Sequence, residues 1–221
     1  MKLTKEAIRN DLKQFLKSIN KEKSAEQTIN INKLFSYLVA TRKFECTFRD
    51  LFACYLQTKY SEEYLVLPEH LLRIKDKRKS VDICFLRRDT DKQPDPVLII
   101  EIKHYCSFNS DNLKKYIEKY LVERLDNIVP EWKGAVGVGI MLINHVDASL
   151  ETLKDCKIKK FKYCSNYLKR KNDHVSNDFD DIKDEIKRVD YELLEGSVIK
   201  GAFKFNEVDE VNTKFLAAIS K

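Results

Sequence analysis

Two short apolar runs that each contain an acidic residue constrain this chain more than any other feature. The runs are Val81–Phe85 and Val97–Lys103, and their β-branched and aromatic residues predict two buried strands. Asp82 lies inside the first run and Glu101 lies inside the second. A carboxylate that is buried and ionised without a partner destabilises a fold by several kcal/mol. Each acid therefore needs a compensating cation, either a metal ion or the Lys103 ammonium group.

Alternation along the second strand places the charged side chains together. Successive side chains of a strand point to opposite faces, so Glu101 and Lys103 share one face while Ile100 and Ile102 point into the core. If the strand of Asp82 lies beside this one, two carboxylates and an amine meet at one edge of the sheet. Mg²⁺ prefers oxygen ligands and takes one or two carboxylates, together with water and substrate phosphate. The pattern predicts a magnesium site, for which Mn²⁺ is a substitute.

The spacing of Asp82, Glu101 and Lys103 resembles the motif of the PD-(D/E)XK nuclease superfamily. An acid two residues before a lysine occurs six times in this chain, because 34% of its residues are charged. Only the copy at Glu101 follows a run of five apolar or proline residues and has an Asp-bearing strand before it. The pair Pro94-Asp95 matches the family name literally, but it lies in the loop just before the second strand. Asp82 therefore fits the motif better.

The resemblance covers residues 45–165 and implies a restriction-endonuclease-like fold. This is an α/β fold with an α-β-β-β-α-β core around a mixed central sheet. The resemblance also implies that Asp82 and Glu101 bind the metal ion, with the Ile102 carbonyl as an additional oxygen ligand. Lys103 would orient the attacking water or help to remove its proton, and would offset the charge that develops on the phosphate.

A third acid is implied by the helix that precedes the first strand, which often contributes to the metal site in this family. Glu45 stands at the start of the apolar segment 44–59 and matches that position. Asp50 and Glu69 compete with it for this role. A plain pairing of Glu45 with Arg49, four residues further along the helix, is the structural alternative.

Periodicity and turn residues divide the chain into three predicted parts. Residues 1–43 form an N-terminal helical accessory segment, with a helix over residues 4–19 capped by Thr4 and another after Ser24. Residues 44–168 form the nuclease-like core, and residues 169–221 form a C-terminal extension packed on it. The predicted core elements are helices at 44–59, 110–125 and 147–156 and strands at 64–74, 81–85, 97–103, 134–143 and 160–167. Those of the extension are a helix at 178–190, a hairpin at 191–206 and a helix from about 207.

The composition predicts a globular protein that does not enter a membrane. The chain has 221 residues, of which 43% are hydrophobic, and no apolar run approaches the length of a membrane span. Its first residues lack the apolar core of a signal peptide, so we expect a cytoplasmic location. Six cysteines match no zinc-binding spacing and are predicted to be free, buried thiols. His104 alternates to the face opposite Lys103, which predicts a structural role.

The formal charge of +6 permits nucleic-acid binding without requiring it. Basic residues flank the Asp82 strand, and among them Arg78 and Lys79 are candidate phosphate contacts. On the helix after the motif, Lys115 and Lys119 are further candidates, although lysines at helical spacing more often face solvent. DNA is the partner that we expect, and the sequence leaves RNA open.

Three interpretations follow. The first is a Mg²⁺-dependent DNA endonuclease of the restriction, resolvase, transposon or phage-defence kind. A two-fold homodimer would suit the cutting of paired strands, and a partner protein from a defence or mobile-element system stays open. The second is a catalytically inactive nucleic-acid-binding or assembly subunit that retains the nuclease fold. The third is an ion pair of Glu101 with Lys103 on an exposed face of the sheet, with an accidental resemblance.

Overall fold

The computed structural model describes residues 3–20, 44–74, 77–88, 94–106, 110–147, 186, 188–194, 199–204 and 210–221. Its helical elements are α1 (Lys5–Asn20), α3 (Phe44–Tyr60), α4 (Ser110–Ile117), the π-helical segment η1 (Glu118–Val122), α5 (Glu123–Asp126) and the short 3₁₀ turn η2 (Val129–Glu131). Its strands are β1 (Tyr64–Ile74), β2 (Lys77–Arg87), β3 (Pro96–Cys106), β4 (Val136–Asp147), β5 (Tyr191–Leu193), β6 (Ile199–Lys204) and β7 (Glu210–Ser220).

The described strands form one mixed sheet. Their order is β1-β2-β3-β4-β7-β5, and β6 also pairs with β7. β1, β2 and β3 are antiparallel neighbours, β3 and β4 are parallel, and β7 is antiparallel to β4, β5 and β6. A parallel pair needs a crossover connection, and α4, η1 and α5 supply it. The predicted mixed α/β class is confirmed.

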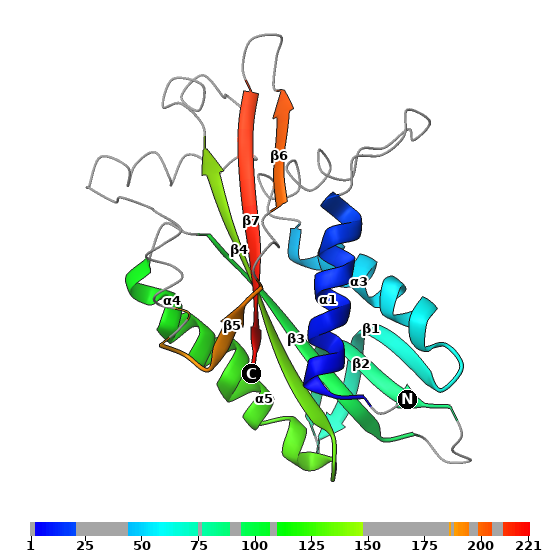
Figure 1. Cartoon of the computed structure of the whole chain (residues 1–221). Coiled ribbons are helices and arrows are strands. Elements are labelled where there is room, and N and C mark those ends of the chain that lie inside the picture. Colours follow the sequence, from blue (N-terminus) through cyan, green and yellow to red (C-terminus); the bar gives the residue numbers. More distant parts are fainter. Residues whose placement is uncertain are drawn as a thin grey trace.

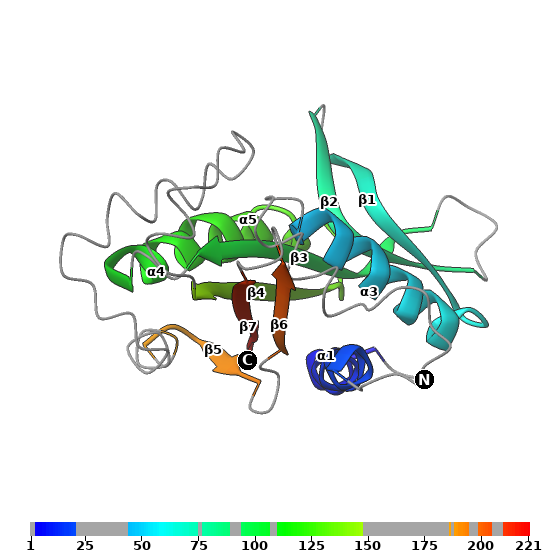
Figure 2. The same ribbon diagram turned by 90° about the horizontal axis from the view of Figure 1, so that it is seen from above.

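Helices cover both faces of the central strands. α1 and α3 lie on one side of β3 and β4, whereas α4 and α5 lie on the other, as two views at right angles show (Figure 1, Figure 2). The alternation of β3 determines this arrangement. Ile100 and Ile102 are buried in the apolar cluster that α1 and α3 complete. Tyr105 packs on the opposite face with residues of α4 and η1.

Packing of α1 against α3 fixes the position of the helix that carries Glu45. α1 begins as predicted, because the Thr4 hydroxyl oxygen accepts a hydrogen bond from the Ala7 N–H at 3.1 Å. The ring of Phe15 in α1 then contacts Phe48 and Phe52 in α3, with centroids 5.6 and 5.1 Å apart. All three phenylalanine side chains are buried. The predicted helices at 4–19 and 44–59 are therefore confirmed.

The edge strand β1 is irregular near Pro68. Pro68 pairs with Ile83 and His70 pairs with Val81, while Glu69 between them adopts a left-handed backbone with φ of 49°. An edge strand tolerates proline because one side of its backbone needs no neighbouring strand. The irregularity lies opposite Asp82 on β2.

Two predictions for the C-terminal part were wrong. Residues 210–220 form strand β7 and not a terminal helix. β7 lies between β4 and β5, and Ala217, Ala218 and Ile219 are fully buried there. Hydrogen bonding to strands on both sides outweighs the helix propensity of alanine in this setting. The predicted hairpin at 191–206 is also wrong, because β5 and β6 each pair with β7.

Several other predictions lie wholly or largely outside the described residues. These are the helix after Ser24, the helix at 147–156 apart from Asp147, the strand at 160–167 and most of the helix at 178–190. Asp147 is the last residue of β4, and residues 188–190 form a turn.

Three of the six cysteines can be compared with their prediction. Cys46, Cys54 and Cys84 are all free thiols, as expected. Only Cys84 is buried, and burial raises the pKa of its thiol to about 12. Cys46 and Cys54 lie on the exposed side of α3, so the expectation of burial was wrong for these two.

Candidate active site

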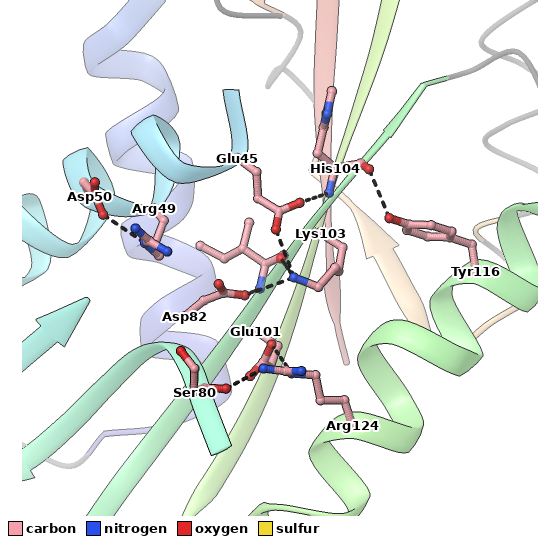
Figure 3. Close-up of polar contacts among 11 residues, drawn as sticks. Glu45, Arg49, Asp50, Ser80, Asp82, Glu101, Lys103, His104, Tyr116 and Arg124 are labelled. Atoms are coloured by element: carbon pink, nitrogen blue, oxygen red, sulfur yellow. Dashed lines mark hydrogen bonds and ion pairs between the residues drawn. The ribbon is translucent and has the colours of Figure 1, made fainter. Parts of the chain in front are cut away.

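The Lys103 ammonium group lies at the centre of the predicted site (Figure 3). Its Nζ atom is 2.9 Å from Glu45 Oε1 and 3.4 Å from Asp82 Oδ2. It also donates a hydrogen bond of 2.7 Å to the Ile102 carbonyl oxygen. These three oxygens come from α3, β2 and β3. The fold thus brings Asp82, Lys103 and the candidate third acid Glu45 together around one amine.

β2 and β3 stop pairing next to Asp82. Their backbone pairing runs from Leu86 with Pro96 to Ile83 with Ile100 and ends there. Beyond this point the Asp82 Oδ2 atom accepts a hydrogen bond from the Ile102 N–H at 2.8 Å. A side-chain acceptor therefore continues the ladder, which explains how an acid is accommodated inside a strand.

Glu45 joins α3 to the end of β3. Its Oε2 atom accepts the His104 N–H at 3.0 Å, while its Oε1 atom binds the Lys103 ammonium. A carboxylate that bridges a backbone amide and an ammonium fixes the position of the lysine relative to the sheet. The structure thus places Glu45 at the site.

Both competitors for the third acid form ion pairs with Arg49. Arg49 Nε is 2.8 Å from Asp50 Oδ1, and its terminal nitrogen is 3.1 Å from Glu69 Oε2. Glu45 therefore does not form the pairing with Arg49 that the alternative predicted. Its bonds to Lys103 and His104 take the place of that pairing.

Glu101 is fully buried, and its carboxylate forms an ion pair with Arg124 of α5. Arg124 Nε is 2.6 Å from Glu101 Oε2, and the guanidinium also donates to the Ser80 carbonyl. The Glu101 side chain is 0% exposed, whereas that of Arg124 is 40% exposed. Among the described residues, Glu101 Oε1 has no hydrogen-bond partner. The exposed ion pair of Glu101 with Lys103 that the third interpretation expects is therefore wrong, because Glu101 is buried and pairs with Arg124.

The pKa values of Glu101 and Lys103 are both raised, which favours the neutral form of the acid and the charged form of the amine. Burial raises the pKa of Glu101 to about 7; the nearby Asp82 carboxylate acts in the same direction and Arg124 opposes it. For Lys103, burial alone would lower the pKa, but the carboxylates of Asp82 and Glu45 outweigh it and raise the pKa above its usual value. Lys103 is therefore an ammonium ion at neutral pH and can attract an anion. A lysine that removes a proton needs the opposite shift.

Sequence reasoning missed Arg124. The residue follows the π-helical segment η1, where the helix turn is wider than in an α-helix. The available signal was the buried acid itself, which required a cation, together with the basic residues of the helix that crosses back over β3. That signal does not choose among Lys115, Lys119 and Arg124.

The predicted nucleic-acid contacts lie outside this centre. Arg78 and Lys79 stand at the beginning of β2, and Arg78 is exposed. Lys115 of α4 and Lys119 of η1 are also exposed. These positions suit contact with a long polyanion, but they do not adjoin the Lys103 ammonium group.

The donor atoms around Lys103 fit a hard divalent ion by their chemistry. Two carboxylates and a backbone carbonyl surround the ammonium, and the buried Glu101 Oε1 has no hydrogen-bond partner in the described part of the chain. Oxygen ligands of this kind are those that Mg²⁺ prefers. Within the described ranges, however, no three His, Cys, Asp or Glu residues are grouped closely enough to hold an ion as they stand. The positive charge at the site comes from Lys103 and Arg124.

Comparison of the chain with protein-family models, with curated proteins and with solved structures finds no match. Among the helices of the described residues, none is both long enough and apolar enough to cross a bilayer.

Proposed function

We propose that this chain is a metal-dependent nuclease of the PD-(D/E)XK kind that hydrolyses phosphodiester bonds of DNA. One observation carries the proposal: Lys103 is surrounded by oxygens of Glu45, Asp82 and Ile102, and Glu101 lies on the same face of β3. The order α3, β1, β2, β3, α4, β4 supports the restriction-endonuclease-like core that the resemblance implies.

The chemistry of the reaction explains why these residues belong together. Hydrolysis of a phosphodiester needs an activated water molecule and neutralisation of the charge that grows on the phosphate. Asp82 and Glu101 would hold a Mg²⁺ or Mn²⁺ ion, with the Ile102 carbonyl and Glu45 as further oxygen ligands. When bound, such an ion lowers the pKa of water and neutralises phosphate charge.

The residues of the chain itself have separate tasks in this proposal. Lys103 donates to a nonbridging phosphate oxygen, because its raised pKa keeps it charged. Glu45 holds Lys103 in place through one carboxylate oxygen and holds the end of β3 through the other. Arg124 offsets the buried charge of Glu101 until another cation is bound. A DNA substrate, a cytoplasmic location and assembly as a homodimer or with a partner protein go with this proposal.

A second candidate function is an inactive nucleic-acid-binding or assembly subunit with the same fold. The ion pair between Arg124 and Glu101 favours it, because a guanidinium at 2.6 Å already neutralises one of the two main metal ligands. In such a subunit the charged groups would hold β2, β3 and α5 together permanently. A divalent ion would then leave the thermal stability of the protein unchanged.

The experiment that tests the first proposal is a cleavage assay with the full chain. Supercoiled plasmid, linear duplex, single strands and branched junctions are incubated with Mg²⁺, Mn²⁺ or EDTA, and the products distinguish nicking, cutting and trimming. We expect metal-dependent cleavage that Lys103→Ala abolishes while the protein still folds and still binds oligonucleotide. The melting temperature of this variant should fall, as that of the control below should, because each substitution removes the cation of a buried ion pair.

Lys59→Ala is the matched control for this assay. Lys59 also pairs through its ammonium group with a buried carboxylate, that of Asp11, but in the contact between α1 and α3. It should retain cleavage. Persistent turnover by Lys103→Ala, or cleavage that EDTA does not stop, would contradict the proposal.

A further inference from the structure

A row of three tyrosine rings leads from the candidate active site to the surface of the molecule. Tyr105 follows Lys103 by two residues on β3, and its ring centroid is 5.2 Å from that of Tyr116. The ring of Tyr116 is in turn 4.6 Å from that of Tyr120. The Tyr116 hydroxyl donates to the His104 carbonyl at 3.4 Å, as Figure 3 shows. The row therefore begins on β3 two residues beyond Lys103, and its second ring is bonded to the backbone of the residue next to Lys103.

Exposure increases along this row. Tyr105 is buried, Tyr116 is partly buried and Tyr120 is 40% exposed. Tyr105 and Tyr116 pack with the apolar cluster beneath α4, whereas Tyr120 is outside that cluster. Single exposed aromatic residues are common on protein surfaces. Tyr120 differs from a single exposed ring because it is the outer end of a continuous line of rings, and the inner end of that line, Tyr105, lies on the same strand as Lys103.

Positive charge accompanies the exposed end of the row. The Lys119 ammonium lies 5.2 Å from the centroid of the Tyr120 ring, close enough for a cation–π interaction. Lys114 and Lys115 are exposed on the preceding turns. Lys119 and Tyr120 also belong to the π-helical segment η1, and such widened turns are frequent at functional sites. An aromatic surface bordered by lysines is complementary to a strand that carries both bases and phosphates.

We infer that Tyr116, Tyr120 and Lys119 form a stacking surface for the unpaired bases of a nucleic-acid strand. The inference rests on the proposed function, because that function places a phosphate of the same strand at Lys103. Stacking on a protein ring requires a base that is free of its pairing partner and of its neighbours, as in single strands, loops and frayed ends. A base on the Tyr120 ring would displace the Lys119 ammonium, which would then bind a phosphate. The substrate class is thus a strand with unpaired nucleotides.

The test measures binding without cleavage. Full-length protein in EDTA is titrated into fluorescently labelled single-stranded DNA, single-stranded RNA of the same sequence and duplex DNA, and anisotropy gives each Kd. We expect Tyr120→Ala to weaken single-strand binding by about 5- to 150-fold, the range that corresponds to loss of one stacked base. Tyr120→Phe retains the ring, so its Kd for a single strand should stay within about twofold of wild type. The Kd for duplex DNA should also stay within about twofold of wild type for both variants.

Two further variants distinguish stacking from the effect of charge and from the loss of any exposed apolar side chain. Lys119→Ala should reduce the slope of log K against log salt for a single strand by about 0.7, the value for one phosphate contact. Leu51→Ala removes an apolar side chain of similar exposure, 37%, from α3 and should not change the affinity. The melting temperature of Tyr120→Ala should stay close to that of wild type, because this residue lies outside the core and loses only its ring contact with Tyr116 and its contact with Lys119.

The outcomes for the stacking surface and for the nuclease can be told apart. Tyr120-dependent binding of either single-stranded polymer supports the surface, even if Mg²⁺ produces no cleavage, and that absence of cleavage would count only against the nuclease. Three results would overturn the surface: no binding of any oligonucleotide, equal single-strand affinity of Tyr120→Ala and wild type, or equal losses for single strand and duplex.

Discussion

Replacing Arg124 with alanine should destabilise the metal-free protein and at the same time increase its response to a divalent ion. Loss of one partner from a fully buried ion pair costs about 3–5 kcal/mol. Arg124 is 40% exposed, so solvent already screens part of the interaction, and we expect a loss of about 2 kcal/mol. For a chain of this length, that loss lowers the melting temperature by about 4–8 °C.

The response to metal follows from the same ion pair. In the wild type, an ion that binds Glu101 must compete with the guanidinium, and in Arg124→Ala it need not. If the competing interaction is worth about 2 kcal/mol, the variant should bind Mn²⁺ about 30-fold more tightly. Excess metal should also restore its melting temperature, because a ligand that binds only the folded state stabilises it, by about 2.7 kcal/mol at 100 times its Kd.

The assay is thermal unfolding at pH 8 over a titration of MgCl₂, with Mn²⁺ binding measured by calorimetry. Lys59→Ala is again the matched control, because Lys59 is 37% exposed and pairs with Asp11, which is 1% exposed. Both variants should lose stability, and only Arg124→Ala should recover it with metal. Equal responses of the two variants to MgCl₂ would refute the assignment of Glu101 as a metal ligand.

Two further predictions concern Glu101 and Gly139. Because burial raises the pKa of Glu101 to about 7, the folded state holds this proton more tightly than the unfolded state, and metal-free stability should fall as the pH rises from about 4.5 to about 7. Glu101→Gln should remove the part of this pH-dependent loss of stability that is due to Glu101, on the order of 3 kcal/mol at most. Urea unfolding in EDTA at pH 5 and pH 8 measures it. A variant that keeps the wild-type dependence of stability on pH would contradict the prediction. A Cβ at Gly139 would overlap the buried hydroxyl of Tyr191, so Gly139→Ala should cost about 1–3 kcal/mol in urea unfolding. Tyr191→Phe should recover part of that loss in the double variant, and no recovery would argue against the packing of Tyr191 on β4.

The central part of the site was predictable because its signals are local. Alternation on a strand is a property of the backbone, so the sequence placed Glu101 and Lys103 on one face opposite Ile100 and Ile102. Asp82 was identifiable because an acid inside a buried strand is costly and needs a reason. Both inferences need only the assignment of two strands, and the apolar runs made that assignment clear.

Arg124 and Glu45 show where local reasoning ends. The pairing of Arg124 with Glu101 depends on how far the helix rotates across β3, and the π-helical turn before it changes that rotation. The sequence allowed Glu45 two roles, a pairing with Arg49 one turn along the helix or a place as third acid at the metal site. Which role Glu45 takes depends on how α3 packs against the sheet, and residue spacing within the helix does not predict that packing.

The prediction of a helix at residues 210–220 was wrong for a related reason. Ala217 and Ala218 favour a helix by intrinsic propensity, but the difference between helix and strand propensities is smaller than the energy of packing in a fully buried sheet. β7 lies between β4 and β5 and is covered on both faces at these residues. A central strand depends on partners that are distant in sequence, namely residues near 140 and near 192.

The balance of charge at the site explains how the fold forms before any metal or substrate is present. Three carboxylates, Glu45, Asp82 and Glu101, lie around two cations, Lys103 and Arg124. Because the pKa of Glu101 is about 7, the net charge of this group near neutral pH lies between zero and minus one. The carboxylates therefore do not require a metal ion to stay together, unlike the ligands of a structural zinc site. A bound phosphate would pair with both cations and leave the carboxylates with less positive charge to neutralise them. On the proposed function, the metal ion and the phosphate should therefore each increase the affinity of the site for the other.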